Sequence, residues 1–386
     1  MEVKPGYKQT EMGVIPKDWA VKRLGELASV TAGGTPSRAN TKYWNGDIPW
    51  ITTSEVGFRN IDHAQQSITK EGLNNSATKL LPPGTLLMAL YGQGKTRGKV
   101  GVLGIEAATN QACAAISLHR GLSGDFVFHF LGSQYEAIRN LSNTGNQENL
   151  NSSLVRSISI ILPPKAEQKA IAEALSDTDA LIESVEQLVA KKRQLKQGAV
   201  RELLTGKKRL PGFSGEWELM RMEEVLKLRY GKSQRGIVDN EGAYPIIATG
   251  GVVGRTNDCI YDKPSVVLGR KGTIDTPQYV DTPFWAIDTT YYTEIFSRAH
   301  PRFLYYLFST MNWYSYNEAS GVPSLSAPTL HNIELVIPSL PEQTAIAAIL
   351  SDMDAEITAL ETKLVKTRQL KQGMMHELLT GRIRLV

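Results

Sequence analysis

The sequence has few of the features that secretion, metal binding or membrane insertion require. It has two cysteines, Cys113 and Cys259, which lie far apart and lack the spacing of a zinc site or a disulfide framework. No run of about 18 or more apolar residues is present, so no membrane span is predicted. Residues 1–19 are polar and carry no apolar signal core, so secretion is not expected. These absences predict a cytoplasmic protein.

Motifs for catalysis are also missing. Gly94-Lys95-Thr96 ends like a phosphate-binding loop, but Ala89 occupies the place of its opening glycine. The Pro-Pro pairs at 82–83 and 163–164 do not belong to the Asp/Asn-Pro-Pro-aromatic tetrapeptide with which amino-group DNA methyltransferases hold a flipped base. The six histidines are scattered, without metal-ligand spacing. The sequence therefore predicts a non-catalytic protein with no metal and no cofactor of its own.

The composition is that of an ordinary globular protein with a mildly basic balance. Of the 386 residues, 41% are hydrophobic and 21% are charged, and the net charge is +4. A charge of this size is compatible with nucleic-acid binding and equally with a protein that binds none.

A long internal repeat sets the organisation of the chain. Residues 163–210 align without a gap to residues 338–385, and more than half of the positions are identical. A weaker repeat begins at Trp19 and at Trp217. The chain is therefore predicted to consist of four parts: an N-terminal domain at 1–160, a first long helix with its connector at 163–210, a C-terminal domain at 211–336 and a second long helix at 338–386.

Both repeats have the apolar spacing of a helix that packs against another helix. Steps of four and three residues separate Ile346, Leu350, Met353, Ile357, Leu360 and Leu364, which match Ile171, Leu175, Thr178, Ile182, Val185 and Val189 in the first copy. The phase then breaks near Lys192 and Thr367, and Leu195 and Leu370 are predicted to resume the stripe in a different register. Gly206 and Gly381 lie where glycine ends a helix.

The two helices are predicted to pack on each other, in preference to a dimer of two chains, because the repeated copy is already tethered. If a pseudo-two-fold axis relates the halves, the helices run antiparallel with one globular domain at each end. Polar residues also recur: Arg193, Gln194, Lys196 and Gln197 reappear as Arg368, Gln369, Lys371 and Gln372. Because the globular halves have diverged, this recurrence predicts that two copies of one partner bind these faces; an inherited solvated face is the alternative.

The globular domains have an α/β pattern. Predicted strands of the first domain are 48–53, 85–91, 99–105 and 112–118, with a helix at 125–141; those of the second are 244–248, 265–268 and 284–287, with a helix at 301–316. Gly-rich basic loops follow a strand in each domain. Since glycine lets the backbone approach a phosphate and arginine can read guanine, these loops and nearby basic residues are candidate DNA contacts; tight solvated turns are the alternative. The candidates are Arg38, Lys42, Arg59, Gln93, Lys95, Arg97, Lys99, Lys232, Arg235, Arg255, Arg270 and Lys271.

Two divergent domains, each followed by a nearly identical helix, resemble the specificity subunit of Type I restriction–modification systems. The matching residues are Ile15-Pro16 with Trp19, the Pro-Pro-x-x-Glu-Gln block at 163–168, the Pro-x-Leu-Pro-Glu-Gln block at 338–343, the Gln-Leu-Lys-Gln-Gly and Leu-Leu-Thr-Gly blocks of both repeats, and Ala-Thr-Asn-Gln-Ala-Cys-Ala at 108–114.

The resemblance implies a fold and a function. The fold is α/β, with two mixed α/β target-recognition domains separated by two long antiparallel coiled-coil helices and related by a pseudo-two-fold axis. Each domain reads one half of a bipartite asymmetric site on double-stranded DNA, and the helices set the spacer. Two modification (methyltransferase) subunits dock on the helices, and restriction (translocase) subunits join the complex. A coiled-coil scaffold that binds no DNA is the alternative function.

Overall fold

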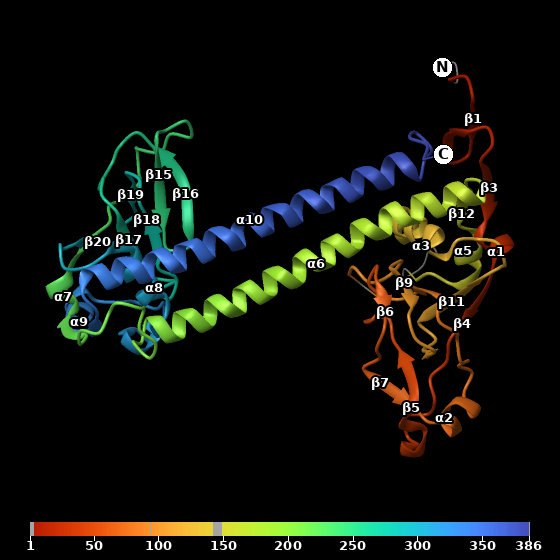
Figure 1. The fold of residues 1–386 in the computed structure, drawn as a ribbon, viewed down its shortest axis with the longest axis horizontal. Coiled ribbons are helices and arrows are strands. Elements are labelled where there is room, and N and C mark those ends of the chain that lie inside the picture. Colours follow the sequence, from red (N-terminus) through yellow and green to blue (C-terminus); the bar gives the residue numbers. More distant parts are fainter. Residues whose placement is uncertain (1–3, 93, 142–148, 386) are drawn as a thin grey trace. The chain divides into compact units, whose positions relative to one another are not determined.

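The computed structural model describes residues 4–92, 94–141 and 149–385, which form two compact units (Figure 1). Unit 1 comprises Met1–Val185 and Lys363–Val386, and unit 2 comprises Glu186–Thr362. Each unit contains one globular part and half of each long helix, because α6 spans Lys165–Leu203 and α10 spans Leu340–Leu378. Both repeats are therefore helical, as predicted. No described helix has the length and apolarity needed to cross a membrane.

The globular part of unit 1 is built on a five-stranded sheet of order β4-β11-β8-β9-β6. Its strands are β4 (Ala28–Ala32), β6 (Asn60–Ile61), β8 (Leu86–Ala89), β9 (Val100–Leu103) and β11 (Cys113–Leu118). A three-stranded sheet, β10-β5-β7, contains β5 (Trp44–Ile51), β7 (Gln66–Ile68) and β10 (Ala108–Thr109). Two further pairs are β1 (Tyr7–Thr10) with β2 (Gly13–Pro16) and β3 (Ala20–Arg23) with β12 (Ser159–Leu162).

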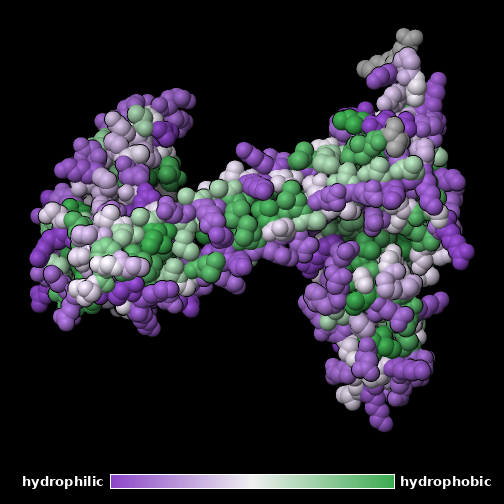
Figure 2. Space-filling model, in the orientation of Figure 1, coloured by the Kyte–Doolittle hydropathy of each residue, from purple (hydrophilic) through white to green (hydrophobic). Residues whose placement is uncertain are grey.

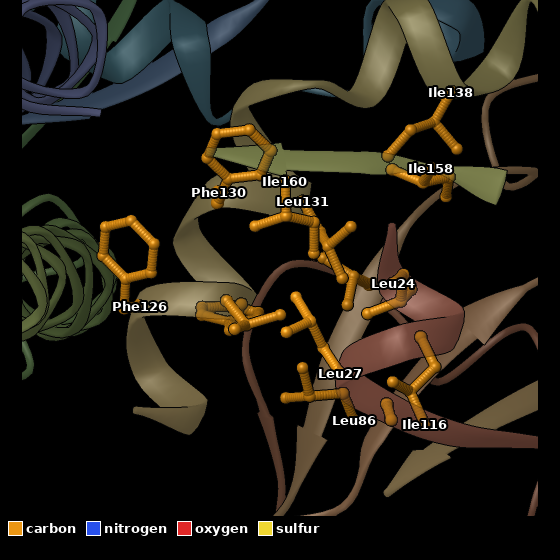
Figure 3. Close-up of a cluster of buried hydrophobic side chains, with 14 of the residues drawn as sticks. Leu24, Leu27, Leu86, Ile116, Phe126, Phe130, Leu131, Ile138, Ile158 and Ile160 are labelled. Carbon is orange, nitrogen blue, oxygen red and sulfur yellow. The ribbon is translucent and has the colours of Figure 1, made fainter. Parts of the chain in front are cut away.

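The five short helices of unit 1 are α1 (Leu24–Leu27), α2 (Lys70–Asn74), α3 (Gly124–Ser133), α4 (Tyr135–Arg139) and α5 (Ser152–Ser157). The core lies where α1 and α3 cover the five-stranded sheet (Figure 3). Phe126 and Phe130 of α3 pack with Leu24 of α1 and with Leu86 and Ile116 of the sheet, and all five are fully buried or nearly so. The sequence predicted one helix at 125–141, but Gln134 divides that segment into α3 and α4.

Unit 2 repeats this architecture with different side chains. Its four-stranded sheet has the order β14-β20-β17-β18, with β14 (Leu226–Tyr230), β17 (Ser265–Gly269), β18 (Gln278–Val280) and β20 (Thr290–Ile295). A second sheet, β16-β15-β19, contains β15 (Tyr244–Ala248), β16 (Gly251–Thr256) and β19 (Trp285–Ala286), and β13 (Glu218–Arg221) pairs with β21 (Glu334–Ile337). The helices are α7 (Met222–Val225), α8 (Pro301–Ser309) and α9 (Ala327–His331), with 3-10 turns η1 (Thr41–Tyr43) in unit 1 and η2 (Trp313–Tyr316) in unit 2.

Most predicted elements are present, some with other bounds. The strand predicted at 244–248 matches β15 and the one at 265–268 falls within β17, whereas β8 and β9 are shorter than the strands predicted at 85–91 and 99–105. The helix predicted at 301–316 ends at Ser309 because Thr310 caps it, and its last residues form the turn η2. The predicted domain boundaries at 160 and 336 fall inside β12 and β21, so each domain includes the strand that leads into its long helix.

Within each unit, the halves of α6 and α10 are joined by ion pairs between repeated residues. In unit 1, Lys371 Nζ lies 2.5 Å from Asp179 Oδ1, and Leu378 packs with Ile171 and Leu175. From Ile171 to Asp179 along α6, the contacting residues of α10 therefore run in the opposite order, from Leu378 to Lys371. In unit 2, Lys196 Nζ lies 2.5 Å from Asp354 Oδ1. Each lysine and aspartate of one pair is the repeat equivalent of its counterpart in the other pair.

The predicted break in the apolar stripe is wrong. Leu195 and Leu370 are 51% and 61% exposed, so they do not resume the stripe. Spacing of four and three continues instead through Lys192 and Lys196 in the first helix and through Thr367 and Lys371 in the second, all of them buried or half-buried. A lysine is accommodated there because Lys192 pairs with Glu356 and Lys196 with Asp354, so that each half-buried ammonium group has a carboxylate partner. Polar residues thus continue the stripe where the sequence pattern suggested a change of register.

The contact between the first globular part and α6 contains a buried histidine. His129 of α3 is 3% exposed, its Nε2 lies 3.1 Å from Ser176 Oγ, and its Nδ1 lies 3.8 Å from Asp179 Oδ2. Burial lowers the pKa of His129 to about 3, and the positive charge of Lys371 adds to the effect. In unit 2, Tyr306 of α8 occupies the equivalent place, and its hydroxyl donates to Asp354 Oδ2 at 2.8 Å.

Acidification is expected to destabilise unit 1 through His129. The unfolded chain takes up the proton near the ordinary pKa of 6.5, whereas the folded unit resists it down to about 3. The stability that neutral His129 contributes is therefore fully present above pH 6.5 and is lost as the pH falls toward 3. The free energy of unfolding is expected to fall by about 2 kcal/mol between pH 7 and pH 5. Chemical denaturation of wild type and of His129→Tyr at both pH values measures this loss. An equal pH dependence in the two proteins would refute the assignment.

Candidate nucleic-acid interface

In unit 1, three loops meet at one edge of the five-stranded sheet. Because β11 is antiparallel to both β4 and β8, the ends of β4 and β8 lie where β11 begins. The loop after β4 is joined to the turn before β11 by Gly34 N donating to Thr109 O at 2.9 Å. The loop after β8 is joined to the same turn by Leu90 N donating to Ala112 O at 2.8 Å. We call these loops and the turn the loop edge of unit 1.

Unit 2 has the same arrangement. Strand β20 is antiparallel to β14 and β17, and the loops after both strands bind the turn before β20. Lys232 N donates to Ala286 O, and Arg270 N donates to Thr289 O, both at 2.8 Å. Similar loops at equivalent places in both domains were predicted from the glycine pattern, and the topology confirms the equivalence.

A glycine and a tryptophan fix the first loop in each unit. A Cβ on Gly33 would lie 2.1 Å from Thr109 O, and one on Gly231 would lie 1.9 Å from Ile287 O, so neither position accepts another residue without backbone movement. The indole Nε1 of Trp50 donates to Gly34 O at 3.0 Å, and that of Trp285 donates to Lys232 O at 2.9 Å. Trp50 lies on β5, the middle strand of its three-stranded sheet, whereas Trp285 lies on β19, an outer strand of the equivalent sheet. Each nevertheless binds the carbonyl of the residue that follows the close-packed glycine of its loop.

The predicted basic residues of unit 1 fall into two groups. Arg38 and Lys42 are exposed on the loop after β4, beside the three-stranded sheet. Lys95 is exposed and Lys99 half-buried on the loop after β8, which is also part of the loop edge, whereas Arg59 is exposed just before β6, the strand at the opposite side of the five-stranded sheet from β4. Arg97 is 5% exposed, so its guanidinium is not part of the surface, contrary to prediction. Gln93 lies outside the described residues.

In unit 2, three of the predicted residues come together at the loop edge. Lys232 and Lys271 are exposed and Arg270 is half-buried around the turn before β20, and the Arg270 guanidinium lies 5.5 Å from the centre of the Tyr230 ring. Arg255 is exposed on β16, but its Nε and one terminal nitrogen donate to the carbonyls of Gly242 and Ala243, which gives it a part in holding the loop. Arg235 is exposed on the loop after β14.

Sequence reasoning missed the aromatic residues of this surface. Arg38 lies over the half-buried Trp44, with the buried Trp50 next to that ring, and the 54% exposed Tyr230 lies beside Arg270. Partly exposed rings next to arginine are typical of nucleic-acid surfaces. The signal in the sequence was weak, because both tryptophans are 6 residues apart on one strand and look like core residues. Figure 2 shows hydrophilic side chains gathered at the tip of unit 1 that carries α2 and β5.

Some of the recurring polar residues of the helices have ion-pair partners within the chain, and most of them are exposed. Lys196 and Lys371 pair with aspartates inside the chain, and Arg193 pairs with Glu361 at 2.5 Å, so these three have internal roles that the sequence did not predict. Gln194 and Gln197 are exposed together with Leu195. Their repeats, Gln369 and Gln372 with Leu370, are exposed as well, and so is Arg368. Among residues 4–92, 94–141 and 149–385, no cluster of His, Cys, Asp or Glu could hold a metal ion.

Comparison with known proteins identifies relatives along the whole chain. The family model described as Type I restriction modification DNA specificity domain matches residues 16–192 and 214–367. The Type I restriction enzyme MjaIX specificity subunit of Methanocaldococcus jannaschii is 22% identical over 428 residues, covering 98% of this chain and 96% of that protein. The EcoR124I/EcoR124II specificity subunit of Escherichia coli is 30% identical over 182 residues, covering 46% of this chain and 45% of that protein.

Solved structures show the same fold. The S subunit of a Type I restriction–modification system from M. genitalium has a TM-score of 0.68 at 17% identity and covers 98% of both chains. A chain from a structure concerned with complex assembly of the type I R-M system has a TM-score of 0.55 at 16% identity and covers 96% of this chain and 99% of that one. These likenesses support the mixed α/β fold of both globular parts.

Proposed function

Because the chain belongs to the Type I restriction modification DNA specificity domain family, we propose that it is the DNA-reading subunit of a Type I restriction–modification complex. Each globular part reads one half of a bipartite, asymmetric site on double-stranded DNA. The chain itself is non-catalytic and acts in the cytoplasm, where modification subunits supply methyl transfer and restriction subunits supply translocation and cleavage.

One observation carries this proposal: the loop edge occurs in both units with the same backbone anchoring and different side chains. The shared backbone scaffold presents the DNA-contacting loops of each unit in the same way, whereas the different side chains of these loops give the two units different base preferences. The exposed basic candidates at the loop edges are Arg38, Lys42, Lys95, Lys232, Arg235 and Lys271, with the half-buried Lys99 in the same loop as Lys95 and the exposed Arg59 before β6.

We further propose that α6 and α10 form an antiparallel coiled coil with pseudo-two-fold symmetry. The ion pairs of Lys196 with Asp354 and of Lys371 with Asp179 support it, because the repeat exchanges one pair for the other. So do the pairs of Arg209 with Glu342 and of Arg384 with Glu167. Such symmetry suits duplex DNA, whose backbone has a local dyad, and the helices then set the unread spacer.

Two modification subunits are proposed to dock on the exposed repeated stripes, Gln194–Leu195–Gln197 and Gln369–Leu370–Gln372. An exposed leucine at the same place in both copies supports a protein partner, since a solvated face needs no apolar residue there. Arg193 and Arg368, also exposed, border these stripes.

Changing either leucine to glutamate is expected to release one modification subunit, and changing both to release two, because a carboxylate is costly in an apolar contact. Co-purification with the modification subunit, followed by mass measurement of the complex, reports the stoichiometry. Leu219→Glu is the matched control, since Leu219 is 63% exposed on β13, away from the stripes. If the double variant Leu195→Glu/Leu370→Glu still binds two modification subunits, these stripes are not the docking surface.

DNA binding separates the proposed function from the alternative scaffold. The complex is expected to shift duplex DNA in a gel, with affinity that falls about 10-fold or more as salt rises from 50 to 200 mM, because basic residues displace counterions from phosphates. A preference for one sequence in competition with mixed DNA is also expected. A complex that binds no duplex at low salt would favour the scaffold.

A further inference from the structure

The guanidinium of Arg38, on the loop after β4, lies over the ring of a tryptophan. Its guanidinium carbon lies 3.7 Å from the centre of the Trp44 ring and 5.2 Å from that of Trp50. The two rings meet edge to face, with centroids 5.1 Å apart at 90°. A guanidinium this close to a ring face gains cation–π attraction and has fewer rotamers available than a solvated arginine.

The tryptophans are themselves fastened to the loop that carries Arg38. Trp50 is 2% exposed and its Nε1 donates to Gly34 O, whereas Trp44 Nε1 donates to Ser37 O at 3.1 Å. The backbone is therefore held four residues before Arg38 and again directly before it. On the other side, Asn40 N donates to Ser37 O and Asn40 Oδ1 accepts from Lys42 N. The orientation of the arginine is fixed by the loop and the rings together.

The polar edge of this arginine is available to a ligand. Arg38 is exposed, and within residues 4–92, 94–141 and 149–385 it forms no ion pair with a carboxylate. Stacking occupies the face of a guanidinium and leaves the N–H donors in its plane free. A planar donor pair held in one orientation matches two adjacent acceptors, as on the major-groove edge of guanine, where O6 and N7 lie side by side.

We propose that Arg38 is a specificity-determining residue that reads a guanine in the half-site bound by unit 1, with Trp44 as its positioning residue. This inference rests on the proposed function. A phosphate contact needs charge and little orientation, and the exposed Lys42 beside it can supply that charge. The bond from Trp50 to Gly34 O has a counterpart in unit 2 and fixes the loop in general, whereas the bond from Trp44 to Ser37 O and the ring under the guanidinium act at Arg38 itself and restrain its plane.

The test is selection of bound sequences from duplexes randomised in one half-site, with the complete complex. Wild type is expected to require guanine at one position of the first half-site. Arg38→Ala is expected to accept all four bases there, with the wild-type site bound about 10-fold or more weaker and other positions unchanged. Arg38→Lys keeps the charge but is expected to lose the same preference, because an ammonium lacks the planar fork. Trp44→Leu is expected to weaken the preference partly.

Two comparison variants make the result decisive. Lys42→Ala is expected to weaken binding to all sequences equally, and Lys22→Ala, exposed on β3 and outside the loop edge, to change neither affinity nor preference. An Arg38→Ala complex that weakens equally on all sequences would make Arg38 a phosphate contact and overturn the proposal, as would an unchanged preference. A wild-type complex without any sequence preference would instead overturn the proposed function.

Discussion

Exchanging residues 213–337 for the same segment of another family member is expected to change one half of the recognised sequence and leave the other half unchanged. The segment contains the whole globular part of unit 2. Strand β21 is exchanged together with its partner β13, since the two strands pair from Glu218 with Ile337 to Arg221 with Glu334. The loop edge of unit 1 is built only from residues before Cys113, so its contacts with DNA stay the same. Mismatch in a half-site costs about 1–3 kcal/mol per base pair, so loss of the original half-site is expected to be nearly complete.

Selection from randomised duplexes measures this exchange. The reciprocal exchange of residues 20–162, from β3 to β12, is the matched control and should change the other half. The helices keep the residues that bind the globular part, among them Ser351 and Asp354 beside Tyr306, so an incoming segment with a hydroxyl or imidazole at that place is preferred. An exchange that alters both halves would contradict the modular reading.

Arg384→Ala is expected to destabilise unit 1 by about 3 kcal/mol, because it leaves a buried carboxylate without its counter-ion. Glu167 is fully buried; its Oε1 accepts from Arg384 Nε at 2.6 Å, and its Oε2 accepts from Trp19 Nε1 at 3.0 Å. Arg384 also binds Asp18, and this hydrogen bond holds the pKa of Asp18 below its ordinary value. Chemical denaturation of wild type and variant measures the loss.

Two further variants give this prediction its controls. Arg382→Ala removes a 59% exposed arginine side chain two residues away and is expected to cost less than about 1 kcal/mol. Adding Glu167→Gln to Arg384→Ala is expected to restore part of the stability, because a neutral amide can still accept from Trp19 without leaving a buried charge. A loss in Arg384→Ala no larger than in Arg382→Ala would contradict the role assigned to this ion pair.

The sequence predicted most of the fold because it contains a duplication, so that its two halves could be aligned with each other. The repeat located both long helices, and the α/β pattern of the sequence predicted the strand at 244–248 and a helix that begins near residue 125. Spacing failed at Lys192 and Lys196, since a pattern read in apolar residues cannot reveal a half-buried lysine that pairs with a glutamate or an aspartate more than 150 residues away. Leu195 and Leu370 were misplaced for the same reason.

The candidate site was predicted less completely. Charge identified Arg38 and Lys42, but only the fold revealed that Trp44 and Trp50 hold Arg38 in place, because the contact joins a loop to a strand. Arg97 shows the opposite error: a glycine-rich basic loop suggested an exposed residue, and the fold buries it.

Methylation mapping of the host genome, with and without this gene, tests most directly whether the complex recognises one split DNA site. We expect one two-part motif with unlike halves and a constant unread gap, whose methylation disappears when the gene is deleted. A methylation pattern that does not depend on the gene, or a continuous or symmetric motif, would contradict it.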